Sequence, residues 1–161
     1  MTFDEFVAVR LTALVRYAAV LAGDRDLAQD VVQDALVRLH ARWSRVEHPE
    51  AFVRRMIVRE YLSWRRRLLR RRALAAQLPA AGVVVDHAAA SVERADLVRR
   101  LSLLPPRQRA VVVLRYYEGL STAEIADLLG CTEGAVRTFH SRAMSALRMS
   151  IDRQNDLEAI R

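Results

Sequence analysis

The sequence contains no lysine, so all 26 of its strongly basic residues are arginines. Its one cysteine, Cys131, excludes an internal disulfide framework and any zinc site built from several cysteines. Glycine and proline are few, at 5 and 4 residues, which argues against an all-β fold because such folds need many turns. No uncharged apolar run approaches the roughly 18 residues of a membrane-spanning helix. We therefore expect no membrane insertion and a cytoplasmic protein.

Apolar residues make up 52% of the chain and aromatic residues only 6%, so the core must consist mostly of leucine, valine and alanine. That composition favours helices and predicts an all-α fold. The net charge is +7, which suggests a polyanionic partner but says nothing about the fold.

The charge is distributed unevenly along the chain. Residues 1–72 carry 15 arginines against 9 acidic residues, residues 73–95 carry 1 against 2, and residues 96–161 carry 10 against 8. The middle stretch is low in complexity and contains Pro79 and Gly82. We predict two small helical domains, 1–72 and 96–155, joined by a linker at 73–95. A structured hairpin or a buried helix is the alternative for this stretch.

Capping patterns and apolar spacing predict three helices before the linker. Thr2 and Glu5 have the capping-box spacing and open a helix to about Leu21. Its apolar positions follow three- and four-residue spacing: Phe6, Val9, Ala13, Leu14, Tyr17 and Val20. A second helix, capped by Asp24 or Asp26, buries one apolar face: Leu27, Val31, Ala35 and Leu39. The third runs from Pro49 to about residue 72.

Four helices are predicted after the linker. Ser91 caps a helix to residue 104, and the next runs from Pro106 to about residue 117. Ser121 and Glu124 form a second capping box, and Thr132 caps a last helix to about residue 151.

Residues 122–141 have the spacing of a helix-turn-helix. Ala126 is small where two helices cross, Gly130 suits a turn with positive φ, and Val136 packs the second helix on the first. Three apolar residues complete the predicted core: Ile125, Leu129 and Phe139. The second helix presents six polar residues for a DNA groove, called here the recognition face: Thr132, Glu133, Arg137, Thr138, Ser141 and Arg142. An ordinary helical hairpin is the alternative.

The helix after Pro49 is rich in arginine. Four of its arginines fall within about 60° of one another on a helical wheel, and we call them the arginine face: Arg55, Arg59, Arg66 and Arg70. Between Arg54 and Arg72 the only acidic residue is Glu60, and Tyr61 and Trp64 lie near the arginines. Clustered arginines beside aromatic residues suit nucleic acid. A generic basic surface or a helix that lies on a membrane surface is the alternative.

Acidic and amide side chains recur at helical spacing on the second helix, and we call them the acidic face: Asp26, Asp30, Gln33 and Asp34. In a basic protein this surface either balances charge or docks a basic partner. No catalytic residues are predicted. The four histidines lack metal-ligand spacing, and no glycine-rich phosphate loop is present, so we predict neither a metal nor a cofactor.

Together these residues resemble the extracytoplasmic-function (group 4) sigma factors of the sigma-70 family, in their actinobacterial type. The run from Asp26 to Asp34 is similar to the family's D-x-x-Q-[DE] helix, and the helix from Pro49 is similar to its −10 element helix. Residues 104–126 closely match the family pattern that runs from "LP" through "EG" to "EIA". The resemblance covers nearly all of the chain except the linker.

The resemblance implies a sigma factor that binds RNA polymerase core, recognises −10 and −35 promoter elements and assists strand opening. The first domain corresponds to region 2, in which the acidic face would bind the clamp helices of the β′ subunit. The arginine face, together with Ser63, would bind the −10 element. The second domain corresponds to region 4, which would bind the β flap and read the −35 duplex with the recognition face. An anti-sigma factor is a further partner typical of this family.

One residue departs from the family pattern, because members usually carry asparagine at the position of Arg59. This position is associated with a flipped base of the −10 element, so Arg59 alters the expected base preference and leaves the expected fold unchanged.

Two other functions fit parts of the sequence. A stand-alone helix-turn-helix regulator would bind duplex DNA without polymerase, but it leaves the acidic and arginine faces unexplained. A sigma-like decoy would bind polymerase or an anti-sigma protein without directing initiation.

Overall fold

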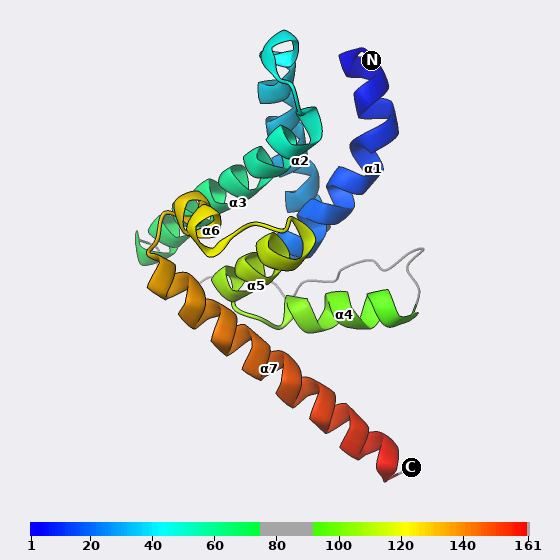
Figure 1. The fold of residues 1–161 in the computed structure, drawn as a ribbon, viewed down its shortest axis with the longest axis vertical. Coiled ribbons are helices and arrows are strands. Elements are labelled where there is room, and N and C mark those ends of the chain that lie inside the picture. The colour runs from blue at the N-terminus through cyan, green and yellow to red at the C-terminus, as the bar shows by residue number, and fades with distance from the viewer. Residues whose placement is uncertain (75–91, 161) are drawn as a thin grey trace. The chain divides into compact units, whose positions relative to one another are not determined.

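The computed structural model describes residues 1–74 and 92–160, and every regular element in these ranges is a helix, which confirms the all-α prediction. The chain forms two compact units, Met1–Asp86 and His87–Arg161. Figure 1 labels the helices of both. Most of the predicted linker, including Pro79 and Gly82, and the predicted cap Ser91 lie outside the described residues.

The first unit contains α1 (Phe3–Ala22), α2 (Arg25–His40) and α3 (Pro49–Leu74). α1 begins at the predicted capping box, in which the Glu5 amide donates to Thr2 Oγ1 at 3.2 Å and the Thr2 amide donates to Glu5 Oε2 at 2.8 Å. It ends at Gly23, whose φ of 71° suits a glycine. Asp24 then caps α2 by accepting from the amides of Asp26 and Leu27, so each of the first two helix starts is fixed locally.

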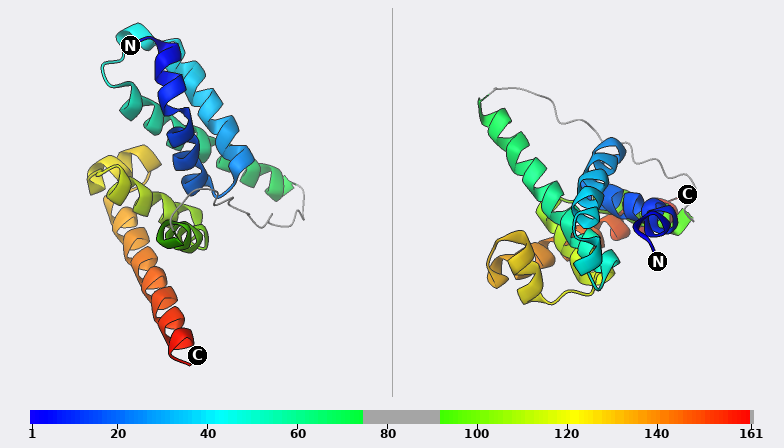
Figure 2. Two further views of the ribbon diagram at one scale, coloured as in Figure 1. Left: turned by 90° about the vertical axis from the view of Figure 1, so that its right-hand side faces the viewer. Right: turned by 90° about the horizontal axis from the view of Figure 1, so that it is seen from above.

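The core of the first unit is made where α2 packs against both α1 and α3, and Figure 2 shows α1 and α2 side by side. All four residues predicted for the inner face of α2 are buried. The apolar stripe of α1 differs from the prediction, because Val9 is 69% exposed and Ala13 is also exposed. Phe6, Leu14 and Tyr17 are buried as predicted, and Val20 is half-buried. Ala18 and Leu21 complete the buried stripe. The apolar spacing of α1 predicts a wider buried sector than α2 and α3 cover.

The connection between α2 and α3 is held by aromatic contacts. It contains the single-turn helix η1 (Trp43–Arg45). The Trp43 ring lies 5.5 Å from the ring of Phe6 and 5.6 Å from that of Phe3, centroid to centroid. Such pairs contribute stabilisation beyond the apolar area they bury, so Trp43 fixes this connection against the start of α1.

The second unit contains α4 (Val92–Ser102), α5 (Pro106–Val112), the π-helical turn η2 (Val113–Tyr117), α6 (Thr122–Leu129) and α7 (Glu133–Ala159). α5, α6 and α7 pack together, and Figures 1 and 2 show α7 as a long helix that begins beside α6. α7 continues beyond the predicted end near residue 151.

A charged network joins α4 to α7. Arg100 donates to Asp96 at 2.8 Å and to Ser150 at 3.3 Å, and it also contacts Gln154. Desolvation acts to raise the pKa of Asp96, but hydrogen bonds from Arg100 and Arg99 outweigh it and hold that pKa below its usual value. The Asp96 carboxylate therefore stays charged at neutral pH and orients Arg100 toward α7.

Candidate nucleic-acid interface

A short turn joins α6 to α7 and sets the geometry of the helix-turn-helix. α6 begins at the second capping box, where the Glu124 amide donates to Ser121 Oγ at 3.2 Å. Gly130 ends α6 with a φ of 64°, and Thr132 Oγ1 accepts from the Ala135 amide at 3.1 Å to begin α7. Both caps and the positive φ agree with the sequence prediction.

The predicted core of this motif forms beneath the turn. Ala126 is 6% exposed and Val136 is 1% exposed, so the two helices pack closely where the sequence has small and branched side chains. Ile125 and Leu129 are also buried, whereas Phe139 is only half-buried. Phe139 therefore lies at the edge of the core that it was predicted to complete.

Gly130 has a positive φ, whereas Gly134 is helical, so alanine substitutions at these two glycines should have opposite effects on stability. Gly130→Ala is expected to destabilise the second unit by about 1–2 kcal/mol, since an L residue is strained at positive φ. Gly134→Ala is expected to stabilise it by roughly 0.5 kcal/mol, because Gly134 is helical and an added Cβ would meet only Thr132 Oγ1, at 3.9 Å. Hydrogen exchange of α6 and α7 amides in the full chain measures both effects. Shifts of the same sign would contradict this account.

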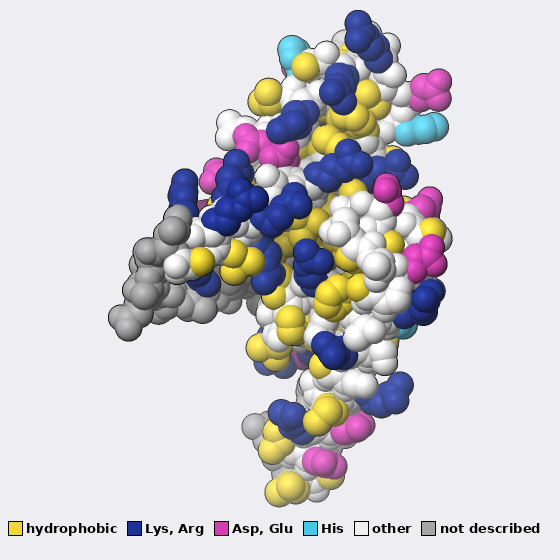
Figure 3. Space-filling model, turned by 90° about the vertical axis from the view of Figure 1, so that its left-hand side faces the viewer, with side chains coloured by type: hydrophobic (Ala, Val, Ile, Leu, Met, Phe, Trp, Pro, Cys, Tyr) yellow, Lys and Arg dark blue, Asp and Glu magenta, His cyan; other side chains and the backbone are white. Residues whose placement is uncertain are grey.

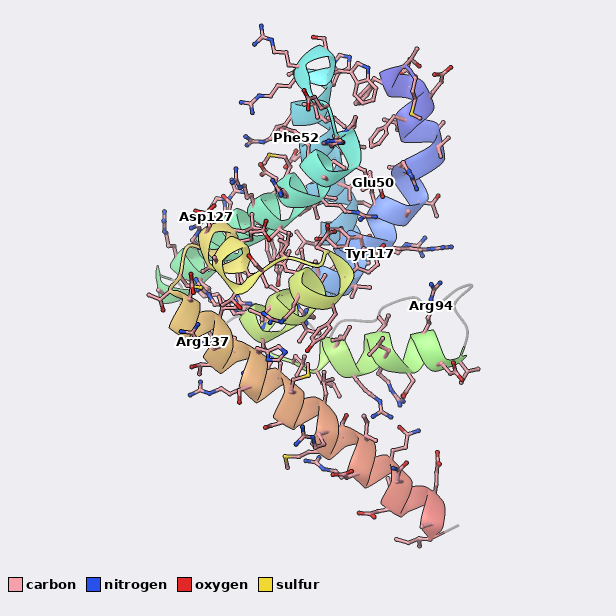
Figure 4. All side chains as sticks on the ribbon, in the orientation of Figure 1. Glu50, Phe52, Arg94, Tyr117, Asp127 and Arg137 are labelled. Atoms are coloured by element: carbon pink, nitrogen blue, oxygen red, sulfur yellow. The ribbon has the colours of Figure 1, made fainter. Side chains whose placement is uncertain are left out.

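The recognition face is exposed at all six positions, Thr132, Glu133, Arg137, Thr138, Ser141 and Arg142. Arg137 is 67% exposed at its side chain and lies 3.7 Å from Glu133, a loose ion pair that costs little to break. Figure 4 labels Arg137 near the start of α7 and Asp127 on α6, one on each helix of the motif. This end of α7 thus offers polar groups and arginines to a partner, as a groove-reading helix does.

The arginine face lies on the solvent side of α3. Its four members are exposed, Ser63 is half-buried, and the helix buries five apolar residues: Val53, Ile57, Val58, Tyr61 and Leu62. Trp64 is half-buried. Figure 3 shows basic side chains, all of them arginines because the chain has no lysine, gathered on one face.

The acidic residues of α3 are paired with arginines outside the arginine face. Glu50 binds Arg10 at 3.0 Å and also binds Arg54, while Glu60 binds Arg38 at 2.7 Å. Among the residues that the structure describes, no carboxylate forms an ion pair with the arginine face. These four guanidinium groups therefore remain available to phosphates or bases.

The acidic face lies on the outer side of α2. Asp26, Asp30, Gln33 and Asp34 are all exposed, and within the described ranges none of the three carboxylates forms an ion pair. Val37 lies on the same side of the helix and is 64% exposed.

Sequence reasoning did not single out Val37, although its spacing of seven from Asp30 places it on the acidic face. It also missed Arg109, which is 5% exposed and donates to the Ser102 carbonyl at 3.3 Å. Arg109 thereby ties α5 to the end of α4. Spacing could have found Val37, but only the fold shows that Arg109 is buried.

The described residues offer little support for other kinds of site. In residues 1–74 and 92–160, no three histidine, cysteine, aspartate or glutamate side chains are grouped as metal ligands would be. No helix in these ranges combines the length and apolar character needed to cross a membrane. Cys131 is half-buried beside the turn.

An arginine-rich helix in one unit and a capped helix-turn-helix in the other define a two-unit helical protein of the nucleic-acid-binding class. Residues 7–72 match Sigma-70 region 2, and residues 94–147 match Sigma-70 region 4. The chain belongs to the sigma-70 family of RNA polymerase sigma factors, in the extracytoplasmic-function group. Its two matched regions support promoter recognition and transcription initiation, and sigma factors are regulatory rather than catalytic proteins.

Curated relatives from actinobacteria agree with this assignment. The chain is 37% identical to an RNA polymerase sigma-E factor of Streptomyces avermitilis, over 99% of this chain and 89% of the relative. It is 34% identical to the ECF RNA polymerase sigma factor SigL of Mycobacterium tuberculosis, over 92% of this chain and 86% of the relative.

Solved structures share the fold. The sigma factor RpoE of Bartonella quintana, in complex with the anti-sigma factor NepR, superposes with a TM-score of 0.70 at 24% identity, covering 93% of this chain and 96% of that chain. The extracytoplasmic function sigma factor SigJ of Mycobacterium tuberculosis gives a TM-score of 0.59 at 26% identity, over 91% of this chain and 53% of that chain.

Proposed function

We propose that this protein binds RNA polymerase core and directs it to promoters by reading −35 and −10 elements with its two units. The observation that carries the proposal is the capped helix-turn-helix with its six exposed polar residues, in the segment that matches Sigma-70 region 4. We assign polymerase and −10 binding to residues 1–72 and −35 binding to residues 96–155, with 73–95 as the linker. α3 and α4 extend into this linker from both sides.

Core polymerase would bind the acidic face of α2. Its three carboxylates form no ion pair within the described residues, so they suit a basic partner surface. The family resemblance identifies that surface as the clamp helices of β′. Charge complementarity would speed the encounter and set its register, and Val37, about one helical turn beyond Asp34, would add a small apolar contact at the end of the face. The second unit would contact the β flap.

The −10 element would bind the arginine face in single-stranded form. Flipping a base out of the duplex costs a few kcal/mol, which backbone neutralisation and stacking offset. α7 would lie in the major groove of the −35 duplex, with Arg137 and Arg142 on base edges or phosphates. Neither unit needs high affinity alone, because their linkage on one polymerase raises the effective concentration of each.

These roles place the protein in the cytoplasm with RNA polymerase, without a metal, a cofactor or catalysis of its own. An anti-sigma factor is a further proposed partner. It is supported by the fold shared with the Bartonella sigma factor, whose structure contains one.

The test is run-off transcription with purified bacterial core polymerase on a genomic promoter library, with and without this protein. New start sites that share two sequence elements would support the proposal and supply both promoter motifs. Core binding without new start sites would indicate a decoy. Specific duplex binding without core binding would indicate a stand-alone regulator.

Arg59 is expected to set base preference within the −10 element. Its exposed guanidinium is a fork that favours guanine, where an amide would favour adenine. Arg59→Asn should therefore change the ratio of affinities for −10 variants by about tenfold, while changing the mean affinity less. Binding of the holoenzyme to a panel of −10 sequences measures both quantities. The exposed Arg67→Asn on the same helix is the control. An equal loss across the panel for Arg59→Asn would reject the hypothesis.

A further inference from the structure

Tyr116 and His140 form a hydrogen-bonded pair at the edge of the recognition face. Tyr116 Oη and His140 Nε2 lie 2.8 Å apart, and the two rings stack with their centroids 5.8 Å apart and their planes at 29°. Tyr116 belongs to η2, whereas His140 lies on α7. The pair therefore extends the surface of α7 onto the element that precedes the helix-turn-helix.

The backbone at Tyr116 is unusual. The Glu118 amide donates to the Val113 carbonyl at 3.3 Å, a bond that spans five residues and makes η2 a π-helical turn. Such turns are rare and frequently occur at functional sites. Here the turn leaves Tyr116 62% exposed while its hydroxyl reaches His140, so the pair is accessible from solvent.

The pair keeps one unused hydrogen-bond donor in either tautomer of the histidine. If Tyr116 donates to Nε2, the ring proton of His140 resides on Nδ1, and that N–H is the remaining donor. If instead Nε2–H donates to Tyr116 Oη, the tyrosine hydroxyl proton is the remaining donor. The mutual bond and the stacking fix both rings, so an anion would find this donor already oriented.

We propose that the Tyr116–His140 pair binds a backbone phosphate of the duplex that flanks the −35 element. The inference rests on the proposed reading of that duplex by α7. Around α7, His140 lies about 60° from Arg137, beside the recognition face and not opposite it. Helix-turn-helix proteins fix their register through phosphate contacts beside the groove, and tyrosine is one of the residues that make them.

The test removes the hydrogen-bonding atoms and keeps both rings. The variant Tyr116→Phe/His140→Phe is assembled with core polymerase, and its affinity is measured for promoter duplexes that each carry one neutral methylphosphonate near the −35 element. We expect the variant to bind the unmodified promoter about tenfold more weakly. At one flanking phosphate, methylphosphonate should weaken wild-type binding and leave the variant unchanged. Tyr117→Phe, which removes the neighbouring hydroxyl, should behave as wild type.

Other outcomes would overturn the inference. Weaker binding with a methylphosphonate profile like that of wild type would show that the pair only braces α7. Unchanged affinity would show that the pair makes no contact with DNA. If Arg137→Ala also leaves promoter affinity unchanged, the proposed −35 function fails together with the inference. If Arg137→Ala weakens binding and the pair variant does not, the inference alone fails.

Discussion

Reversing two charges on α2, with Asp30→Arg and Asp34→Arg together, is expected to abolish assembly with core RNA polymerase. Both carboxylates are exposed one helical turn apart, on the surface proposed to meet a basic partner. Removing one member of a desolvated charge pair at an interface costs about 2–5 kcal/mol, and reversal adds repulsion. The dissociation constant should therefore rise more than 100-fold. Fluorescence anisotropy of labelled protein titrated with core polymerase measures it.

The matched control places the same two substitutions elsewhere. Asp152→Arg with Asp156→Arg has the same four-residue spacing on an exposed part of α7 and changes the net charge equally. It should assemble with core polymerase as wild type does. Equal losses in the two variants would show that total charge, and not the acidic face, governs assembly. Circular dichroism should show both variants folded, because all four positions are exposed.

Helix starts were the most predictable part of the fold, because capping is a local interaction. Thr2, Ser121 and Thr132 each accept from an amide three residues on, as their spacing indicates. Gly130 was equally predictable, because a helix end followed at once by a new cap needs a left-handed residue. These features depend on a few neighbouring residues, which the sequence shows directly.

Long-range packing was less predictable. Val9 fits the apolar spacing of α1 yet is 69% exposed, because burial depends on which helices cover that sector. The wide turn at η2 arises where the chain leaves α5, and no local pattern marked it. Arginine is usually a surface residue, but the fold buries Arg109 against carbonyl groups at the end of α4.

The candidate site follows the same division. Exposure of the recognition, arginine and acidic faces was predictable, because each consists of polar residues at helical spacing. Two ion pairs of α3 were not predictable from the sequence: Glu50 with Arg10 of α1, and Glu60 with Arg38 of α2. In both pairs the partner comes from another helix. Because these acids pair with other arginines, the positive charge of the arginine face is not neutralised by them, which favours a polyanionic ligand.

Removing two arginines from the recognition face, with Arg137→Ala and Arg142→Ala together, is expected to weaken −35 binding roughly 100-fold. An arginine that forms a bidentate bond to guanine contributes about 1–3 kcal/mol of discrimination, and one on a phosphate contributes through counterion release. If one of the two reads a base, the variant should also discriminate less between −35 sequences. Holoenzyme binding to wild-type and altered −35 duplexes, at two salt concentrations, separates these contributions.

A control on the same helix keeps the charge change and the spacing. Arg148→Ala with Arg153→Ala removes two exposed arginines five residues apart, farther along α7 from the turn that begins the recognition face. A groove-reading helix contacts bases mainly through its N-terminal part, so this variant should retain −35 specificity and lose affinity at most slightly. Equal losses in the two variants would show that α7 attracts DNA only through its overall charge. Run-off transcription should then fall equally for both, without a change in the start sites chosen.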